Sequence, residues 1–319
     1  MPAFRSASVT AIISERAGLQ RVETDLGRAY VLTQLTGPVA RGDRVVLNTT
    51  AVDLGLGTGG WHVVHWNLAR DGWEQGGGGH IMKLRYTSLQ VDSGSAEEEH
   101  ADLPAELDGM PVVVCTLHSQ VAIVAIVLRH LVPERRIAYV MTDGGALPLV
   151  LSELVADLRD RSVVDATITA GHAFGGDLEA VAVPSALALA RHTARADVAI
   201  VGMGPGVVGT GSVLGTTAVE AAAVLDAATA LGGQPVLCVR ASNADERDRH
   251  RGTSHHTETV LHLARSSVLA PGAEQAQLDV EAVLAASGVE VTTMGRGYRD
   301  DPAFFQAAAA AARVAAELL

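Results

Sequence analysis

From Pro111 onward, continuous apolar runs alternate with segments of helical length, and this pattern restricts the fold more than any other feature of the sequence. Runs that are apolar throughout are typical of strands covered on both faces. Six such runs are PVVVCTL, RIAYVMT, VVDATIT, ADVAIVGM, QPVLCVR and GVEVTTM. The segments between and after them predict helices near residues 119–131, 148–160, 180–194, 216–231, 255–266 and 274–287, and a terminal helix with Asp301 as N-cap and Pro302 as its first residue. Residues 111–319 are therefore predicted to form an α/β domain, with a Rossmann-like, mostly parallel sheet and helices on both faces.

Residues 1–75 follow another pattern, in which short alternating runs are separated by turn signals such as DLGR and TGPVARGD. Alternation of apolar and polar residues predicts half-buried strands. We expect a small β-barrel or sandwich domain here, with Tyr30, Trp61 and Trp66 filling its interior.

Residues 76–110 predict a glycine-rich and acidic connector that contains one strand, in HIMKLRYTSLQ. The four glycines from Gly76 to Gly79 suit a flexible linker, or a backbone that approaches a ligand closely. A further hypothesis is that the segment from Gly76 to Lys83 forms a lid that folds over the sheet edge.

The chain has 319 residues, a net charge of −12 and two cysteines, and these values argue against several classes of protein. Generic binding to nucleic acid needs a cation-rich surface, so we expect no nucleic-acid partner. The longest apolar runs are shorter than the roughly 20 residues of a membrane span, and we expect a cytoplasmic protein. Cys115 and Cys238 each lie inside an apolar run, which predicts buried thiols in a reducing compartment.

Candidate functional residues gather where the predicted strands end. Ligands of an open parallel sheet bind outside the carboxyl ends of its strands, and five consecutive strand ends here carry glycine and titratable side chains. We expect His118, His172 and His256 to transfer protons. Asp143, after the second strand, and Lys83, the one lysine of the chain, are predicted to bind substrate.

The loop after the fourth strand, GPGVVGTGSVLG, contains the G-x-G-x-x-G spacing at Gly204, Gly206 and Gly209. A dinucleotide fingerprint belongs on the first strand of its unit and needs an acid at the end of the next strand, which ends here in Arg240, so NAD(P) is disfavoured. We expect these glycines and Gly211 to cradle an anion beside a helix N-terminus. The alternative is a loop whose glycines only permit tight turns.

The segment RDRHRGTSHHTET follows the fifth strand and is rich in cationic groups. Arg247, Arg249 and Arg251 suit a bidentate clamp for phosphate or carboxylate, with His250 beside them. An exposed loop that neutralises itself through Asp245 and Asp248 is the alternative.

Ser254 is predicted to cap the helix that follows this segment and to lie in the substrate site. At 100° per residue, His256 and Thr257 project toward the edges of the buried arc, and His256 is expected to face the site. The opposite face is predicted to carry His255, Glu258, His262 and Arg265.

A divalent metal ion is a candidate cofactor, because several of the histidines and acids follow separate strand ends. The candidate ligands are His118, His172, Asp177 and His256. Whether these side chains converge is left open, since the sequence contains no H-E-x-x-H or paired C-x-x-C motif.

The strings GHIMKLRYTSLQ, LHSQ, GPGVVGTGSVLG and RDRHRGTSHHTET resemble an uncharacterised bacterial family catalogued as domain of unknown function 3866. The resemblance spans most of the chain and implies no activity or catalytic residue. The residues themselves favour an enzyme, a hydrolase or group transferase that acts on a small anionic substrate, phosphorylated or nucleotide-like, at the sheet edge. A non-catalytic metabolite-sensing or assembly protein that uses the same site is the alternative, and we expect a homo-oligomer.

Overall fold

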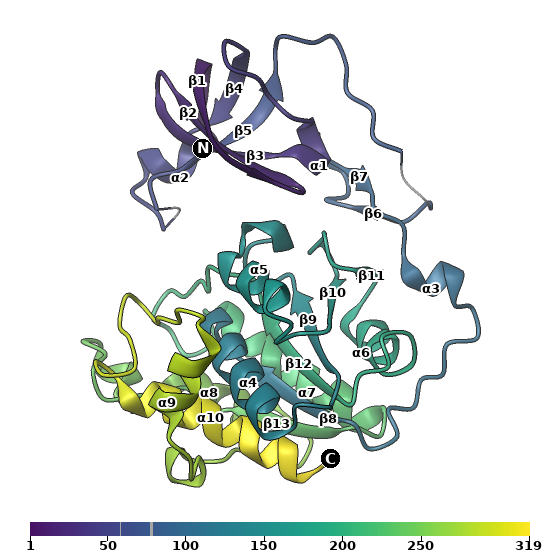
Figure 1. Cartoon of the computed structure of the whole chain (residues 1–319), viewed down its shortest axis with the longest axis vertical. Helices are drawn as coiled ribbons and strands as arrows, with labels where there is room; N and C mark the ends of the chain where they lie inside the picture. The colour runs from purple at the N-terminus through teal and green to yellow at the C-terminus, as the bar shows by residue number, and fades with distance from the viewer. Residues whose placement is uncertain (58, 77–78) are drawn as a thin grey trace. The chain divides into compact units, whose positions relative to one another are not determined.

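The computed structural model describes residues 1–57, 59–76 and 79–319 and divides into two compact units, Met1–Ser93 and Gly94–Leu319 (Figure 1). Gly77 and Gly78, from the glycine run interpreted as a linker or lid, lie outside the described residues.

The first unit is a closed β-barrel, as the alternating pattern predicts. Its strands are β1 (Phe4–Arg16), β2 (Leu19–Thr24), β3 (Gly27–Leu32), β4 (Arg44–Asn48) and β5 (His62–Asn67), closed in the order β1-β2-β3-β5-β4. The shorter elements of this unit are α1 (Thr33–Thr36), α2 (Thr50–Asp53), β6 (Met82–Lys83) and β7 (Val91–Asp92). The HIMKLRYTSLQ segment, predicted as one strand, therefore supplies only β6 and the turn that leads to β7.

The barrel core is built from small aliphatic side chains, such as Val22, Val31 and Leu47, and the prediction for the aromatic residues was wrong. Tyr30 lies between buried Ala29 and Val31 on its strand, so its ring points outward and stacks on Trp61 at 4.7 Å between centroids. Trp66 is also only half-buried. A narrow barrel has room for valine-sized side chains, and the large rings pack on its outer face instead.

The second unit contains a six-stranded, fully parallel sheet. Its strands are β8 (Pro111–Cys115), β9 (Ile137–Thr142), β10 (Ala166–Ala170), β11 (Leu178–Ala180), β12 (Val198–Met203) and β13 (Gln234–Cys238). Five of them match predicted runs. The sixth predicted strand, GVEVTTM, was wrong: residues 288–294 contribute an isolated bridge from Thr293 to Arg296 and no sheet strand. The sixth strand of the sheet is β11, which lies at the edge beside β10.

The strand order is β11-β10-β9-β12-β8-β13, which differs from the 3-2-1-4-5-6 order of a Rossmann fold. The parallel α/β architecture is therefore confirmed, whereas the closer Rossmann likeness is not.

Helices cover both faces of this sheet (Figure 1). Side chains such as Val113, Cys115 and Tyr139 face a core shared with α4 (His118–Leu131), α9 (Val280–Ser287) and α10 (Pro302–Glu317). Val112, Val114 and Val140 face the other core, with α6 (Val183–His192) and α7 (Glu220–Ala230). The remaining elements are α3 (Ala96–Glu99), η1 (Leu149–Leu151), α5 (Glu153–Asp160), η2 (Thr217–Val219), β14 (Ala241–Ser242), η3 (Asp248–His250), β15 (Gly252–Thr253), α8 (His255–Leu263) and η4 (Ala273–Gln275). None of the described helices combines the length and apolar character needed to cross a membrane.

The two cysteines are buried and free, as predicted, and the fold also makes them neighbours. Cys115 on β8 is the register partner of Cys238 on β13. Burial raises the pKa of the Cys115 thiol well above its usual range, which keeps it protonated and unreactive.

We therefore expect Ellman's reagent to label almost no thiol in the native protein and two thiols per chain in denaturant without reductant. Rapid labelling of the native protein would contradict this burial. Fewer than two thiols after unfolding would show that the pair forms a disulfide.

Candidate functional site

A cavity of about 380 Å³ opens where β8, β12 and β13 end. These three strands are neighbours in the sheet. The lining residues follow the strands directly: the start of α4 after β8, the glycine-rich loop after β12, and the segment from Arg240 to His256 after β13. Leu154 and the segment 292–294 complete the wall. This volume lies within the range of small-molecule sites.

The connectivity explains why a hollow forms at this edge. The chain leaves β8 through α4 toward one face of the sheet and leaves the adjacent β12 through α7 toward the other face. Helices that diverge from neighbouring strands leave a crevice outside the carboxyl ends of those strands. The predicted location of the site at this edge thus coincides with the cavity.

Asp245 organises the cationic side of the cavity. Its buried carboxylate accepts two hydrogen bonds from the Arg247 guanidinium, both at 2.9 Å, and lies 3.5 Å from Arg240 and 3.7 Å from Arg296. The hydrogen bonds and charge of Arg247 hold the pKa of Asp245 well below its usual range. Arg296 also contacts Asp301 at 3.4 Å.

Asp301 precedes α10 as predicted, but its side chain does not cap that helix. The carboxylate instead accepts hydrogen bonds from the Ser242 hydroxyl and the Asn243 backbone N–H. Asp301 therefore joins α10 to the segment that carries the arginines.

Arg249 lines the cavity and has no hydrogen-bond or ion-pair partner among the described residues. Its guanidinium lies beside Gly211, where an added Cβ would approach it to 3.7 Å. Arg240, Arg247 and Arg249 all line the cavity, and the described lining contains no Asp or Glu. Four guanidinium groups and two buried carboxylates leave this cluster with a net charge of about +2.

The glycine-rich loop contributes three of its four predicted residues to the cavity: Gly206, Gly209 and Gly211. Gly211 has a φ of +86°, a conformation that favours glycine. Gly204 does not line the cavity and has a packing role, since a Cβ there would lie 2.3 Å from the carbonyl oxygen of Ala146.

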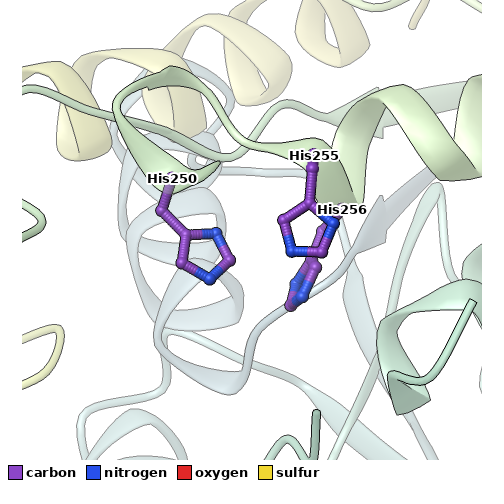
Figure 2. A group of neighbouring side chains, drawn as sticks. All are labelled: His250, His255 and His256. Atoms are coloured by element: carbon purple, nitrogen blue, oxygen red, sulfur yellow. The ribbon is translucent and has the colours of Figure 1, made fainter. Parts of the chain in front are cut away.

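Three histidines belong to the cavity lining, and Figure 2 shows their rings close to one another. Nitrogen atoms of His250, His255 and His256 lie within 4.8 Å of one another. The ring centroids are 4.5 Å apart between His255 and His256 and about 5 Å from each of these to His250.

The prediction that His255 lies on the outward face of its helix was wrong. Ser254 caps α8 by accepting the backbone N–H of His256, as predicted, so His255 and His256 are the first two helical residues. Cα–Cβ bonds in a helix tilt toward its N-terminus, and side chains at the first two positions therefore both reach beyond the helix end. His262, which shares the expected face, is exposed.

The hydrogen-bond partners define the tautomer of His256. The Arg240 guanidinium lies 3.0 Å from Nδ1 of His256. A guanidinium can only donate, so Nδ1 accepts and Nε2 carries the hydrogen. Nδ1 of His250 shares a hydrogen bond of 2.7 Å with the Ser254 hydroxyl, whereas Nε2 of His255 is buried without a partner in the described structure.

The surroundings of all three imidazoles favour their neutral form. Burial, followed by the charge of Arg240, lowers the pKa of His250 to about 4 and that of His256 to about 3. Burial and the charge of Arg249 also lower the pKa of His255. The positive charge of the cavity is therefore carried by its arginines.

His118, predicted as catalytic, lines the cavity but has both ring nitrogens bonded to protein. Nδ1 donates to the Met203 carbonyl at 3.1 Å, so Nε2 accepts from the Ser152 hydroxyl at 2.7 Å. Burial lowers its pKa to about 4. This ring connects the ends of β8 and β12 to the cap of α5.

Of the four predicted metal candidates, His256 belongs to the histidine group of the structure, whereas His118, His172 and Asp177 do not. His172 and Asp177 follow β10, which is separated from β13 by three strands. At about 4.8 Å per strand, this places them roughly 19 Å from the end of β13 along the sheet. Asp177 instead accepts from Thr167 and pairs with Arg159.

Other predicted residues also lie outside the cavity lining. Asp143 accepts the backbone N–H of His172. The Nε of Arg251 donates to the Asp245 carbonyl, and its side chain remains 60% exposed. Lys83 lies in β6 of the first unit. Conversely, Arg240 and His255 line the cavity although the sequence reasoning assigned neither to it, and their positions next to a strand end and a helix cap were the available signals.

A separate carboxyl, Glu220 at the start of α7, has a perturbed acidity. Burial raises its pKa from 4.5 to about 7, against the hydrogen bond from Thr142, and the charge of Asp143 adds to the increase. Because the folded pKa exceeds the unfolded one, the folded chain binds this proton more tightly, and the resulting stability is lost as pH rises from about 4.5 through 7.

We expect Glu220→Gln to remove this loss. The amide keeps an acceptor for Thr142 but has no charge to bury, so the variant should gain about 2–3 kcal/mol relative to wild type when the pH is raised from 4.5 to 8. Urea unfolding followed by circular dichroism at both pH values measures the difference. The exposed Glu290→Gln should show no such pH dependence, and parallel pH profiles for wild type and Glu220→Gln would refute the assignment.

Comparison with known proteins places the chain beside one family model. The model described as "Protein of unknown function (DUF3866)" matches residues 28–283 and 269–312. No curated protein and no solved structure matches the chain.

Proposed function

The chain belongs to the DUF3866 family, whose description assigns no activity, and from the site itself we propose that it binds a small phosphate-bearing anion in the cavity of the second unit and acts on it as a hydrolase or group transferase. The observation that carries this proposal is the unpaired guanidinium of Arg249, which lies with Arg240 in a lining without described carboxylates.

The chemistry of the lining supports an anion with several oxygen atoms. A guanidinium presents parallel N–H donors that match two oxygens of a phosphate or carboxylate. Nε2 of His256 adds a neutral N–H donor, since Arg240 fixes its tautomer. The glycine loop brings backbone close to the cavity at Gly206, Gly209 and Gly211.

Phosphate and pyrophosphate are the first compounds to test, by calorimetric titration and thermal unfolding. A ligand that binds only the folded protein at 100 times its Kd stabilises it by about 2.7 kcal/mol. For a unit of this size we expect the Tm to rise by roughly 5–10 °C. Acetate at the same ionic strength is the control, because it has one negative charge and two oxygens.

Turnover separates an enzyme from a metabolite sensor. We expect a panel of phosphate esters and anhydrides to include at least one that is consumed, as detected by released phosphate. A phosphate-bearing ligand that raises the Tm and is recovered intact from every such reaction would favour the sensor. No Tm shift with any phosphorylated compound would refute the anion site.

A further inference from the structure

The histidine cluster of the cavity has features that anion binding does not require. His250, His255 and His256 come from two adjacent segments, η3 and the start of α8, and their ring nitrogens lie within 4.8 Å of one another (Figure 2). Two of the three side chains are more than nine-tenths buried.

The hydrogen bonds of the cluster leave a ring nitrogen without a protein partner on His255, and they can leave one on His250. Nε2 of His255 is buried and has no partner among the described residues, so it is available to a group that enters the cavity. Nδ1 of His250 lies 2.7 Å from the Ser254 hydroxyl. If this nitrogen donates to Ser254, Nε2 of His250 keeps its lone pair, an arrangement that orients metal-binding imidazoles in many proteins.

We propose that His250, His255 and His256 bind a divalent transition-metal ion of the zinc class, and that Arg240 competes with this metal for His256. Imidazole nitrogens are preferred ligands of such ions, and three histidines leave a fourth position open to an exogenous ligand. Zn–N distances of about 2.0–2.1 Å place tetrahedral ligands about 3.4 Å apart. The proposal therefore requires the present spacing of up to 4.8 Å to close when the ion binds.

Arg240 bonds to His256 in the structure and competes with a metal ion for this side chain. A metal-bound imidazole usually donates its other N–H, but Nδ1 of His256 accepts from Arg240, and Nε2 therefore carries hydrogen. Metal binding at His256 requires this bond to break. Asp245, 3.5 Å from the second terminal nitrogen of Arg240, offers the guanidinium a place to move.

The nearby arginines couple the metal to an anion. A cation that enters beside Arg240, Arg247 and Arg249 meets like charges, and an anion bound to these groups and to the open metal position offsets them. Because coupling between two ligands is reciprocal, sulfate should increase zinc affinity by about tenfold, and zinc should increase sulfate affinity by the same factor.

The test is zinc binding to the untagged full-length chain, measured by elemental analysis after gel filtration and by competition with a chromophoric chelator. We expect about one zinc per chain, and His250→Ala and His255→Ala should each lower zinc affinity by roughly 10- to 100-fold. His262→Ala is the matched control, because this histidine is exposed on the same helix, and it should bind as wild type does. Circular dichroism verifies folding, and His255→Gln provides a second, less disruptive variant.

Arg240→Met tests the competition. Removing the guanidinium frees Nδ1 of His256 and also removes one positive charge from the cavity, so zinc affinity should rise by about tenfold. Cobalt supplies a spectroscopic readout, since three nitrogen ligands in a tetrahedral site give intense visible bands that shift when sulfate occupies the open position.

Three results would overturn the proposal: less than roughly 0.1 zinc per wild-type chain, equal zinc affinity in His255→Ala and wild type, or weaker zinc binding in Arg240→Met. Loss of the metal site with phosphate binding intact would leave the proposed function standing. Zinc binding without any effect of phosphate on the protein would support the metal site and refute the proposed function.

Discussion

Asp245→Asn is expected to lower the free energy of unfolding of the second unit by about 3–5 kcal/mol, because it leaves the buried guanidinium of Arg240 without its counter-charge and removes an ion pair from the partly exposed Arg247 and Arg296. The carboxylate is 3% exposed and has guanidinium groups of Arg240, Arg247 and Arg296 within 3.7 Å. Asparagine has nearly the same shape but no charge. The loss therefore measures the electrostatic role of Asp245 rather than its packing.

Urea unfolding followed at 222 nm reports this change, since most helical residues of the chain belong to the second unit. The three tryptophans lie in the first unit, so their fluorescence follows another part of the chain, and a single two-state fit is unsuitable. Asp248→Asn is the control, because its carboxylate is 97% exposed and should contribute less than about 0.5 kcal/mol. Equal effects of the two variants would contradict the role of Asp245.

Arg249→Ala is expected to weaken the binding of phosphate by roughly 10- to 100-fold, which corresponds to about 1.4–2.8 kcal/mol. This guanidinium has no ion-pair partner in the described chain and lines the cavity, so its hydrogen-bonding capacity is available to a ligand. Hydrogen bonds to charged groups contribute about 1.5–3 kcal/mol each. Folding should be unaffected, since the side chain is exposed.

Arg251→Ala provides the matched control two residues away. Its side chain is also exposed, but it lies outside the cavity lining. Calorimetric titration with phosphate should give the wild-type Kd within about twofold for this variant. The anion site as described here would be refuted if Arg251→Ala lost phosphate binding and Arg249→Ala retained it.

Much of the fold follows from patterns that are local in sequence. Continuous apolar runs predicted five strands of the parallel sheet near their observed positions, and alternating runs predicted the β domain. The GVEVTTM run shows the limit of this reasoning. An apolar run becomes a strand only when a neighbouring strand has free hydrogen-bonding groups beside it, and a local pattern does not specify such a neighbour.

The residues predicted for the candidate site also fall into two groups, those that line the cavity and those that lie elsewhere. Arg247, Arg249, His250 and His256 were predicted because parallel strands bring their carboxyl ends to one edge, and all four line the cavity. His172 and Asp177 satisfied the same rule and nevertheless lie far along the sheet. Strand order decides which ends are neighbours, and it arises from long-range pairing that single-strand patterns do not encode.

The sequence by itself determined the class of each unit, the burial of its two cysteines, the cap at Ser254 and the sheet edge where a site can form, because each depends on the periodicity or chemistry of a short segment. The tertiary structure alone decided that His255 joins His250 and His256, that Asp245 collects three arginines, and that Arg249 remains unpaired. These depend on distances between side chains that strand order and helix ends bring together. Their chemistry therefore emerges only when the chain has folded.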